Sequence, residues 1–193
     1  GGLAMLNFPL LSLAVFLPIL GILILFFIPK NKTALIRVTS GIITFLTLIV
    51  SLVIFAHFNI NDPGLQLQER LSWIPQVNIN YHLGVDGLSY SMVFLTALLC
   101  FLACVASNSI KERIKEYYIF FLLLEAGMMG TFLALDLFLF YVFWEITLVP
   151  MYFLIGIWGG PRKEYAAIKF FLYTLAGSVF MLLGILALYF TST

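Results

Sequence analysis

The sequence predicts an all-α polytopic membrane protein of about six transmembrane helices, and three observations lead to this prediction. Hydrophobic residues make up 63% of the 193 residues and charged residues only 10%, whereas a soluble domain carries roughly 25% charged residues. The mean hydropathy is +1.10. The apolar residues gather in six stretches, each close to the length of about 20 residues that a helix needs to cross a bilayer.

The six candidate spans are joined by connections of unequal length. They are residues 8–28, 35–58, 88–106, 117–135, 137–157 and 165–190. The fourth and fifth belong to one apolar stretch that is broken chiefly by Asp136. One helix of that length, rising about 1.5 Å per residue, would overshoot the membrane. A tight turn is therefore expected at Asp136, and we expect Asp86 and Asp136 to cap the helices that follow them.

The chain divides into three segments by this reading. Residues 1–7 are an N-terminal end in which Gly-Gly-Leu-Ala precedes Met5, a pattern typical of an artificial leader. Residues 8–106 hold the first three helices and an external loop, 59–82, and residues 107–193 hold the last three. The first stretch has spanning length but lacks a basic leader and a cleavage site, so it is expected to remain as a helix.

The external loop contains an alternating pattern. Val77, Ile79 and Tyr81 interleave with Asn78 and Asn80, and this period of two predicts a short strand. The strand could pair with the segment around residues 65–67 as a surface hairpin. An ordered loop without strands is the alternative.

The basic residues predict the orientation of the helices. Nine of the ten lie on alternate connections, where the positive-inside rule places the cytoplasm, and only Arg70 lies on the other side. Both ends of the chain are therefore expected to face the periplasm. The nine are Lys30, Lys32, Arg37, Lys111, Arg113, Lys115, Arg162, Lys163 and Lys169.

Several classes of function find no support in the residues. The net charge of +1 does not indicate a nucleic-acid partner. Cys100 and Cys104 lie one turn apart on one helix face and are expected to serve packing. His57 and His82 lie near the outer surface, whereas a buried haem requires ligands that face each other. No phosphate loop, no CxxC and no nucleophile–base pattern occurs, so soluble redox chemistry is not expected.

Glu145 is the strongest candidate for a functional residue. It lies eight residues into its span, which places it roughly 12 Å from the outer end. An ionised carboxylate at such depth costs about 2.5–3.5 kcal/mol and must be offset by a partner, water or protonation. A role in proton transfer is one reading, and a hydrogen bond from Tyr141 is the alternative. Pro150 predicts a kink and a hydrated pocket nearby, although proline kinks are common in membrane helices.

Two further charged residues are candidates for proton transfer. Glu125 lies eight residues into the fourth span, with Gly127 and Gly130 beside it, and these glycines predict a close approach of another helix. The two acids could form a relay or pack independently. Lys169, near the start of the sixth span, either snorkels to the interface or points into the bundle beside Tyr173.

Three segments resemble a known family. They are YHLGVDGLS at 81–89, FLFYVFWEITLVPMYFLIGIWGG at 138–160 and RKEYAAIKFFLYTLAGS at 162–178. They resemble the antiporter-like subunit M family of bacterial NADH:quinone oxidoreductase, respiratory complex I, which includes mitochondrial subunit 4 and a plastid homologue. The resemblance covers most of the chain from Trp73 onward, and the first two helices match mainly in hydropathy and position.

The resemblance implies a fold of about fourteen helices with two inverted five-helix repeats. This chain would be its N-terminal portion, with three leading helices and the first three helices of repeat one. Glu145 matches the family's proton-handling glutamate, and Lys169 matches a family position at the head of the sixth helix. The subunit would carry no cofactor of its own, because flavin, iron–sulfur clusters and quinone belong to partner subunits.

The implied role is that of a proton-translocating subunit in the bacterial inner membrane, surrounded by lipid and by other membrane subunits of complex I. This chain alone is expected not to transport protons, because it stops before the broken helix and the later lysines of the family. Two alternatives stay open. One is a subunit of an Mrp-type cation/proton antiporter, and the other is a structural or assembly fragment without transport.

Overall fold

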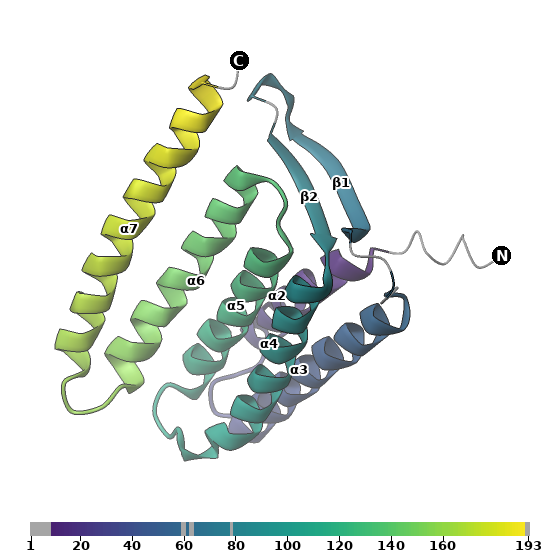
Figure 1. Cartoon of the computed structure of the whole chain (residues 1–193). Helices are drawn as coiled ribbons and strands as arrows, with labels where there is room; N and C mark the ends of the chain where they lie inside the picture. Colours follow the sequence, from purple (N-terminus) through teal and green to yellow (C-terminus); the bar gives the residue numbers. More distant parts are fainter. Residues whose placement is uncertain (1–8, 59–60, 62–63, 78, 192–193) are drawn as a thin grey trace.

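The computed structural model describes residues 9–58, 61, 64–77 and 79–191, which form a bundle of apolar helices with one small β-hairpin (Figure 1). The hairpin lies between α3 and α4 in the chain and consists of β1 (Gln66–Ile74) and β2 (Ile79–Val85). Residues 1–7, predicted as a leader, lie outside the described residues. The helices are α2 (Leu10–Phe26), α3 (Thr33–Ala56), α4 (Gly87–Ala106), α5 (Ile114–Leu133), α6 (Leu137–Trp158) and α7 (Lys163–Thr191).

The six predicted helices are all present, and this confirms the all-α membrane fold apart from the small hairpin. Among the described residues, five helices, α3 to α7, are long and apolar enough to cross a membrane. The first helix, α2, has 17 residues and is shorter than its predicted span, 8–28. It ends at Phe26, shortly before Pro29, whose ring disfavours a helical conformation in the residue ahead of it.

Consecutive helices pack against each other, including α3 and α4, which the hairpin separates in the chain. In addition, α2 packs against α5, so that residues far apart in the sequence share one core. The helices α5, α6 and α7 form a row with α7 at its edge (Figure 1), and α7 packs against α6.

The buried apolar residues form two clusters along the bundle. The cluster near the hairpin takes Leu11 from α2, Val93 from α4 and Met129 from α5. The other takes Leu25 from α2 and Leu122 from α5, among others. Between the levels of Leu122 and Met129 lies Glu125, so this carboxyl sits where the two clusters meet. Cys100 and Cys104 belong to the second cluster as free, buried thiols, in agreement with their predicted packing role.

Asp136 and Asp86 cap helices as predicted. The Asp136 carboxylate accepts hydrogen bonds from the backbone N–H groups of Phe138 (2.9 Å) and Leu139 (3.1 Å), and α6 begins directly after it. The tight turn between α5 and α6 is therefore confirmed. Asp86 accepts from the N–H of Ser89 at 2.8 Å, and this bond lowers the pKa of the Asp86 carboxyl below its ordinary value.

The external loop does form a hairpin, and its strands are longer than the segments predicted. β1 and β2 are antiparallel. His82, predicted to lie in a loop, lies instead in β2, where its Nε2 is 3.0 Å from Oε1 of Gln68. Burial lowers the pKa of this imidazole below its ordinary value.

The hairpin holds two parts of the bundle together. Glu69 of β1 accepts hydrogen bonds from the first N–H groups of α2, at 2.8 Å from Leu11, and from the Ser12 hydroxyl. On the other strand, the N–H of Asn80 donates to the second carboxylate oxygen of Asp136 at 3.0 Å. The hairpin thus ties the start of α2 to the turn between α5 and α6.

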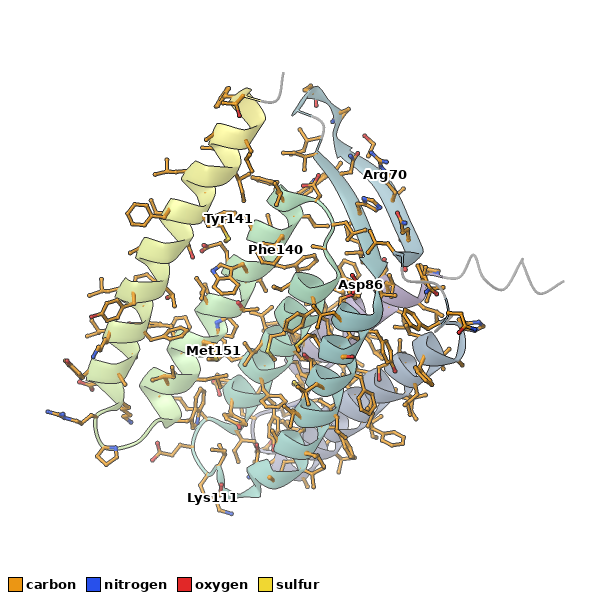
Figure 2. The ribbon with its side chains drawn as sticks, viewed as in Figure 1. Arg70, Asp86, Lys111, Phe140, Tyr141 and Met151 are labelled. Carbon is orange, nitrogen blue, oxygen red and sulfur yellow. The ribbon has the colours of Figure 1, made fainter. Side chains whose placement is uncertain are left out.

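The basic connections meet at the end of the bundle opposite the hairpin. The Lys115 ammonium donates to the backbone carbonyls of Phe26 (3.1 Å) and Ile28 (2.9 Å), and Lys30 pairs with Glu116 at 3.4 Å. Figure 2 shows Lys111 at this end and Arg70 on the hairpin at the other. The clustering of the basic loops is what the orientation prediction requires. We call this end the basic end.

Candidate functional site

Glu145 lies inside α6, eight residues after Leu137, at the depth that the sequence predicted. Its side chain is partly buried, and one carboxylate oxygen is buried without a hydrogen-bond partner in the described part of the chain. The Tyr141 hydroxyl, one turn earlier, interacts with the carboxylate, and Figure 2 shows this tyrosine on the upper half of α6. The pair of Tyr141 and Glu145 therefore fits both a purely structural hydrogen bond and a role of Glu145 in proton transfer.

Pro150 is buried in α6, and the helix continues through it to Trp158. Because proline lacks an N–H, the carbonyl of Ile146 loses its usual donor in the helix. The cavity between α6 and α7 has a volume of about 340 Å³ and begins at Tyr152, two turns beyond Glu145. This cavity lies toward the basic end from Glu145, and the hydrated pocket beside Glu145 stays a prediction.

Gly127 and Gly130 allow α5 and α6 to approach closely, as their spacing indicated. A Cβ atom on Gly127 would lie 2.7 Å from Cγ2 of Thr147, and one on Gly130 would lie 2.2 Å from Cδ1 of Phe143. These positions therefore define the faces by which the two helices touch.

The same contacts show where the two glutamates point. Each residue of an α-helix is rotated by about 100° from the one before it. Glu125 is two residues from Gly127, and Glu145 is two residues from both Phe143 and Thr147, so each carboxyl lies about 200° away from its contact face. The glutamates project to opposite sides of the α5–α6 pair. A direct relay between them would need intervening groups.

Glu125 is the more deeply buried of the two acids. Its side chain is 0% exposed, and both carboxyl oxygens lack a hydrogen-bond partner among the described residues. The thiol of Cys100, on α4, lies beside the carboxyl. An unpaired carboxylate in such surroundings is costly, so the site favours either the neutral acid or bound water.

Lys169 lies apart from both acids. Ala167 of α7 faces α6, because its Cβ is 3.4 Å from the position of a Cβ on Gly156, and Lys169 two residues later is on the opposite face. The lysine is exposed, with its ammonium 5.9 Å from the ring centre of Tyr165 and 5.8 Å from that of Tyr173. The predicted neighbour Tyr173 is confirmed, while an interior position near the acids is not seen.

A set of buried hydroxyl groups was not anticipated from the sequence. Along one face of α3, four hydroxyl side chains are 0% exposed, namely those of Ser40, Thr44, Thr47 and Ser51. Their spacing of four, three and four residues is the helical repeat, and this periodicity was the available signal. It is weak because serine and threonine satisfy their own hydroxyls in apolar helices.

Among the residues that the structure describes, no group of three His, Cys, Asp or Glu side chains could hold a metal ion. What the arrangement offers is protonation chemistry: two carboxyls at membrane depth, each with at least one unpaired oxygen.

Two family models match the chain. The amino terminus of NADH-ubiquinone oxidoreductase chain 4 matches residues 12–141, and the transmembrane model of NADH:quinone oxidoreductase and Mrp antiporters matches residues 134–193. NADH-quinone oxidoreductase subunit M of Rickettsia bellii is 41% identical over 194 residues, covering 96% of this chain and 39% of the relative. The chain thus spans about two fifths of that protein's length.

Solved structures agree in fold. A chain of respiratory complex I from Thermus thermophilus superimposes with a TM-score of 0.77 at 29% identity, covering 91% of this chain and 35% of that one. A chain of the Mrp complex from Dietzia sp. gives a TM-score of 0.66 at 20% identity, covering 94% of this chain and 19% of that one. The likeness to the Mrp complex shows the fold alone, so the sequence relationship favours the oxidoreductase over the antiporter alternative.

Proposed function

This chain belongs to the NADH-quinone oxidoreductase subunit M (chain 4) family of membrane proteins, and from that premise we propose that it couples quinone reduction in partner subunits to proton translocation. Glu145 is the buried carboxylate that takes up and releases the proton. The observation that carries the proposal is the unpaired, buried oxygen of Glu145 at membrane depth in an otherwise apolar helix.

The chemistry follows from the electrostatics of a carboxyl in an apolar bundle. A nearby cation favours the ionised form of Glu145, and withdrawal of that cation favours uptake of a proton. Movement of a positive charge in a neighbouring helix therefore changes the proton occupancy of Glu145. Redox chemistry takes place elsewhere in this proposal, with flavin, iron–sulfur clusters and quinone held by other subunits.

Lys169 and Glu125 are proposed as further proton-transfer residues with separate positions. Lys169 lies inside α7, six residues after Lys163 at the start of that helix. Since it projects away from α6, it would serve a group that packs on the outer face of α7. Glu125 is fully buried on the far side of α5 and is considered separately below.

The proposed setting is the bacterial inner membrane. Its apolar helices and its relation to the Rickettsia protein make the chain a multi-pass inner-membrane protein. We place the basic end in the cytoplasm and both chain ends on the periplasmic side. Other membrane subunits of the complex and the lipid bilayer would be its partners.

The proposal is tested by replacing Glu145 with Gln in the complete complex. Gln keeps the size and the hydrogen-bonding capacity of Glu but cannot change charge. Glu145→Gln should therefore lower NADH-driven quinone reduction in coupled membranes about a hundredfold or more, the scale on which loss of a proton-transfer group acts. Glu164→Gln, at an exposed glutamate of α7, is the matched control and should retain the rate. Rates are compared at equal content of assembled complex. A near-normal rate for Glu145→Gln would remove the assignment.

A further inference from the structure

The buried hydroxyls of α3 form one side of a polar column inside the bundle. The hydroxyl of Ser40 donates to the carbonyl of Ile36 at 2.9 Å, and that of Thr44 donates to the carbonyl of Ser40 at 3.0 Å. Each hydroxyl donates its hydrogen bond to a carbonyl of the preceding turn, but its oxygen can still accept a hydrogen bond. The face of α3 therefore offers acceptors to a group or a water molecule beside it.

Two thiols and a carboxyl form the other side. Cys104 of α4 lies beside Thr44, and Cys100, one turn along the same face, lies beside Glu125. Cys100 and Cys104 are 7% and 4% exposed. The helices α3, α4 and α5 thus bring polar groups to one interface. At this interface, among the described residues, both carboxyl oxygens of Glu125 lack a hydrogen-bond partner.

The column continues toward the basic end. Tyr118 lies two turns before Glu125 on the same face of α5, and its hydroxyl accepts a hydrogen bond from Arg37 at 3.3 Å. Tyr118 also interacts with Cys104. Arg37 donates to the backbone carbonyls of Ser107 (2.9 Å) and Ile110 at the boundary of the basic loops. Polar groups therefore connect Glu125 with the basic end of the bundle.

Toward the hairpin, α5 presents apolar groups instead. Met129 and Leu133, one and two turns beyond Glu125, are both 0% exposed and belong to the apolar cluster near the hairpin. The polar groups along this face of α5 therefore end at the Glu125 carboxyl. Without a counter-ion, such a carboxyl is expected to bind a proton, because apolar surroundings favour the neutral acid.

We propose that the α3–α4–α5 interface is a second proton-binding site, in which Glu125 is the carboxyl and the groups from Tyr118 through Cys104 and Thr44 carry protons to it from the basic end. The reaction is the addition of one proton to a carboxylate oxygen and its release by the same route. The site extends the proposed function to a carboxyl that faces away from Glu145. Its test observes that carboxyl itself, so it can fail while the role of Glu145 stands.

The experiment is infrared spectroscopy of membranes that hold the assembled complex, during exchange from H₂O to D₂O. A protonated Glu125 gives a carboxylic C=O stretching band that shifts when its proton is replaced by deuterium. The band should be missing in Glu125→Gln and displaced in Glu125→Asp. These two variants assign the band, and the aspartate variant retains an acid at the site if the glutamine variant fails to assemble.

The access route is tested by two conservative substitutions. Thr44→Val and Tyr118→Phe each remove a hydroxyl and keep the shape, and each should slow deuterium exchange of the Glu125 band about tenfold, which corresponds to the loss of one hydrogen-bonding step. Thr174→Val on α7 removes a hydroxyl that, like that of Thr44, donates to its own helix, and it should leave the exchange rate unchanged. The absence of any band that depends on Glu125 would overturn the proposal. Exchange at the wild-type rate in both Thr44→Val and Tyr118→Phe would overturn it as well.

Discussion

Single residues determine which way the glutamates of α5 and α6 face. Gly127 and Gly130 occupy the α5 surface that touches α6, and a Cβ at either position would collide with Thr147 or Phe143. The close approach fixes the rotation of both helices about their axes. As a result Glu125 is turned toward α4, beside Cys100, and the two carboxyls are presented to different surroundings.

Gly130→Ala should therefore destabilise the bundle. The added methyl group would lie 2.2 Å from the Phe143 ring, and overpacking of this kind costs about 1–3 kcal/mol. The free energy of unfolding of the chain in detergent measures the effect. Gly41→Ala, in the interior of α3 with no atom within 4 Å of the new Cβ, is the control and should be neutral or gain up to about 1 kcal/mol from helix propensity. Equal values for the two variants would show that the α5–α6 contact is not tight.

The depth of Glu145 along its helix could be predicted from the sequence. Glu125 lies eleven residues after the start of α5, and not eight, because α5 begins at Ile114. The directions of the two side chains could not be predicted. Depth follows from counting residues along an apolar stretch at a known rise. Direction depends on which face of each helix is covered, and the apolar residues surround these helices too evenly to mark one face. The direction of Lys169 stayed open for the same reason, since its neighbour Tyr173 fits either alternative.

At the level of elements, the hairpin connects helices that are distant in the chain. Glu69 holds the first N–H groups of α2, and Asn80 donates to Asp136 at the turn before α6. Both contacts supply partners for helix-start groups that would otherwise be unsatisfied. The alternation of Val77, Ile79 and Tyr81 was enough to predict a strand and a possible partner around residues 65–67, although Val77 itself lies in a 3-10 helix before β2. The link of the hairpin to α2 could not be foreseen, because it rests on long-range contacts.

Asp136→Ala should cost more stability than Asp86→Ala. Both aspartates cap a helix, and loss of a cap costs about 0.5–2 kcal/mol. Asp136 in addition accepts from the N–H of Asn80 at 3.0 Å, so its removal leaves a further donor without its partner and loosens the hairpin. Thermal unfolding of each variant in detergent gives the comparison. A larger loss for Asp86→Ala would contradict the bridging role of Asp136.

For the whole molecule, the distribution of charge along the bundle is the basis of the orientation that we predict. The basic loops meet at one end, where Lys115 and Arg37 bind backbone carbonyls of other connections. Arg70 lies on the hairpin at the opposite end, as Figure 2 shows. This arrangement was predictable from sequence because it depends only on the order of spans and loops. The packing of α2 against α5 was not predictable, since no local pattern encodes it.

Cysteines introduced at Lys32 and Asn61 should be labelled from opposite sides of the membrane. Lys32 lies in the turn before α3, and Asn61 lies beyond the other end of α3. A membrane-impermeant thiol reagent added to intact cells should modify the cysteine at 61, and the cysteine at 32 only after the membrane is opened. Cys100 and Cys104 are buried and should not interfere. Labelling of both positions from the same side would contradict the orientation.

The central claim is that Glu145 couples quinone reduction to proton movement by changing its own protonation. The most direct test is the number of protons pumped per NADH oxidised, measured in sealed membrane vesicles that contain each variant at equal content of assembled complex. We expect Glu145→Gln to lose most of the proton pumping because a neutral amide cannot exchange a proton, and Glu145→Asp to retain part of it because the carboxyl survives at a shifted position. Near-normal proton pumping by Glu145→Gln would contradict the claim.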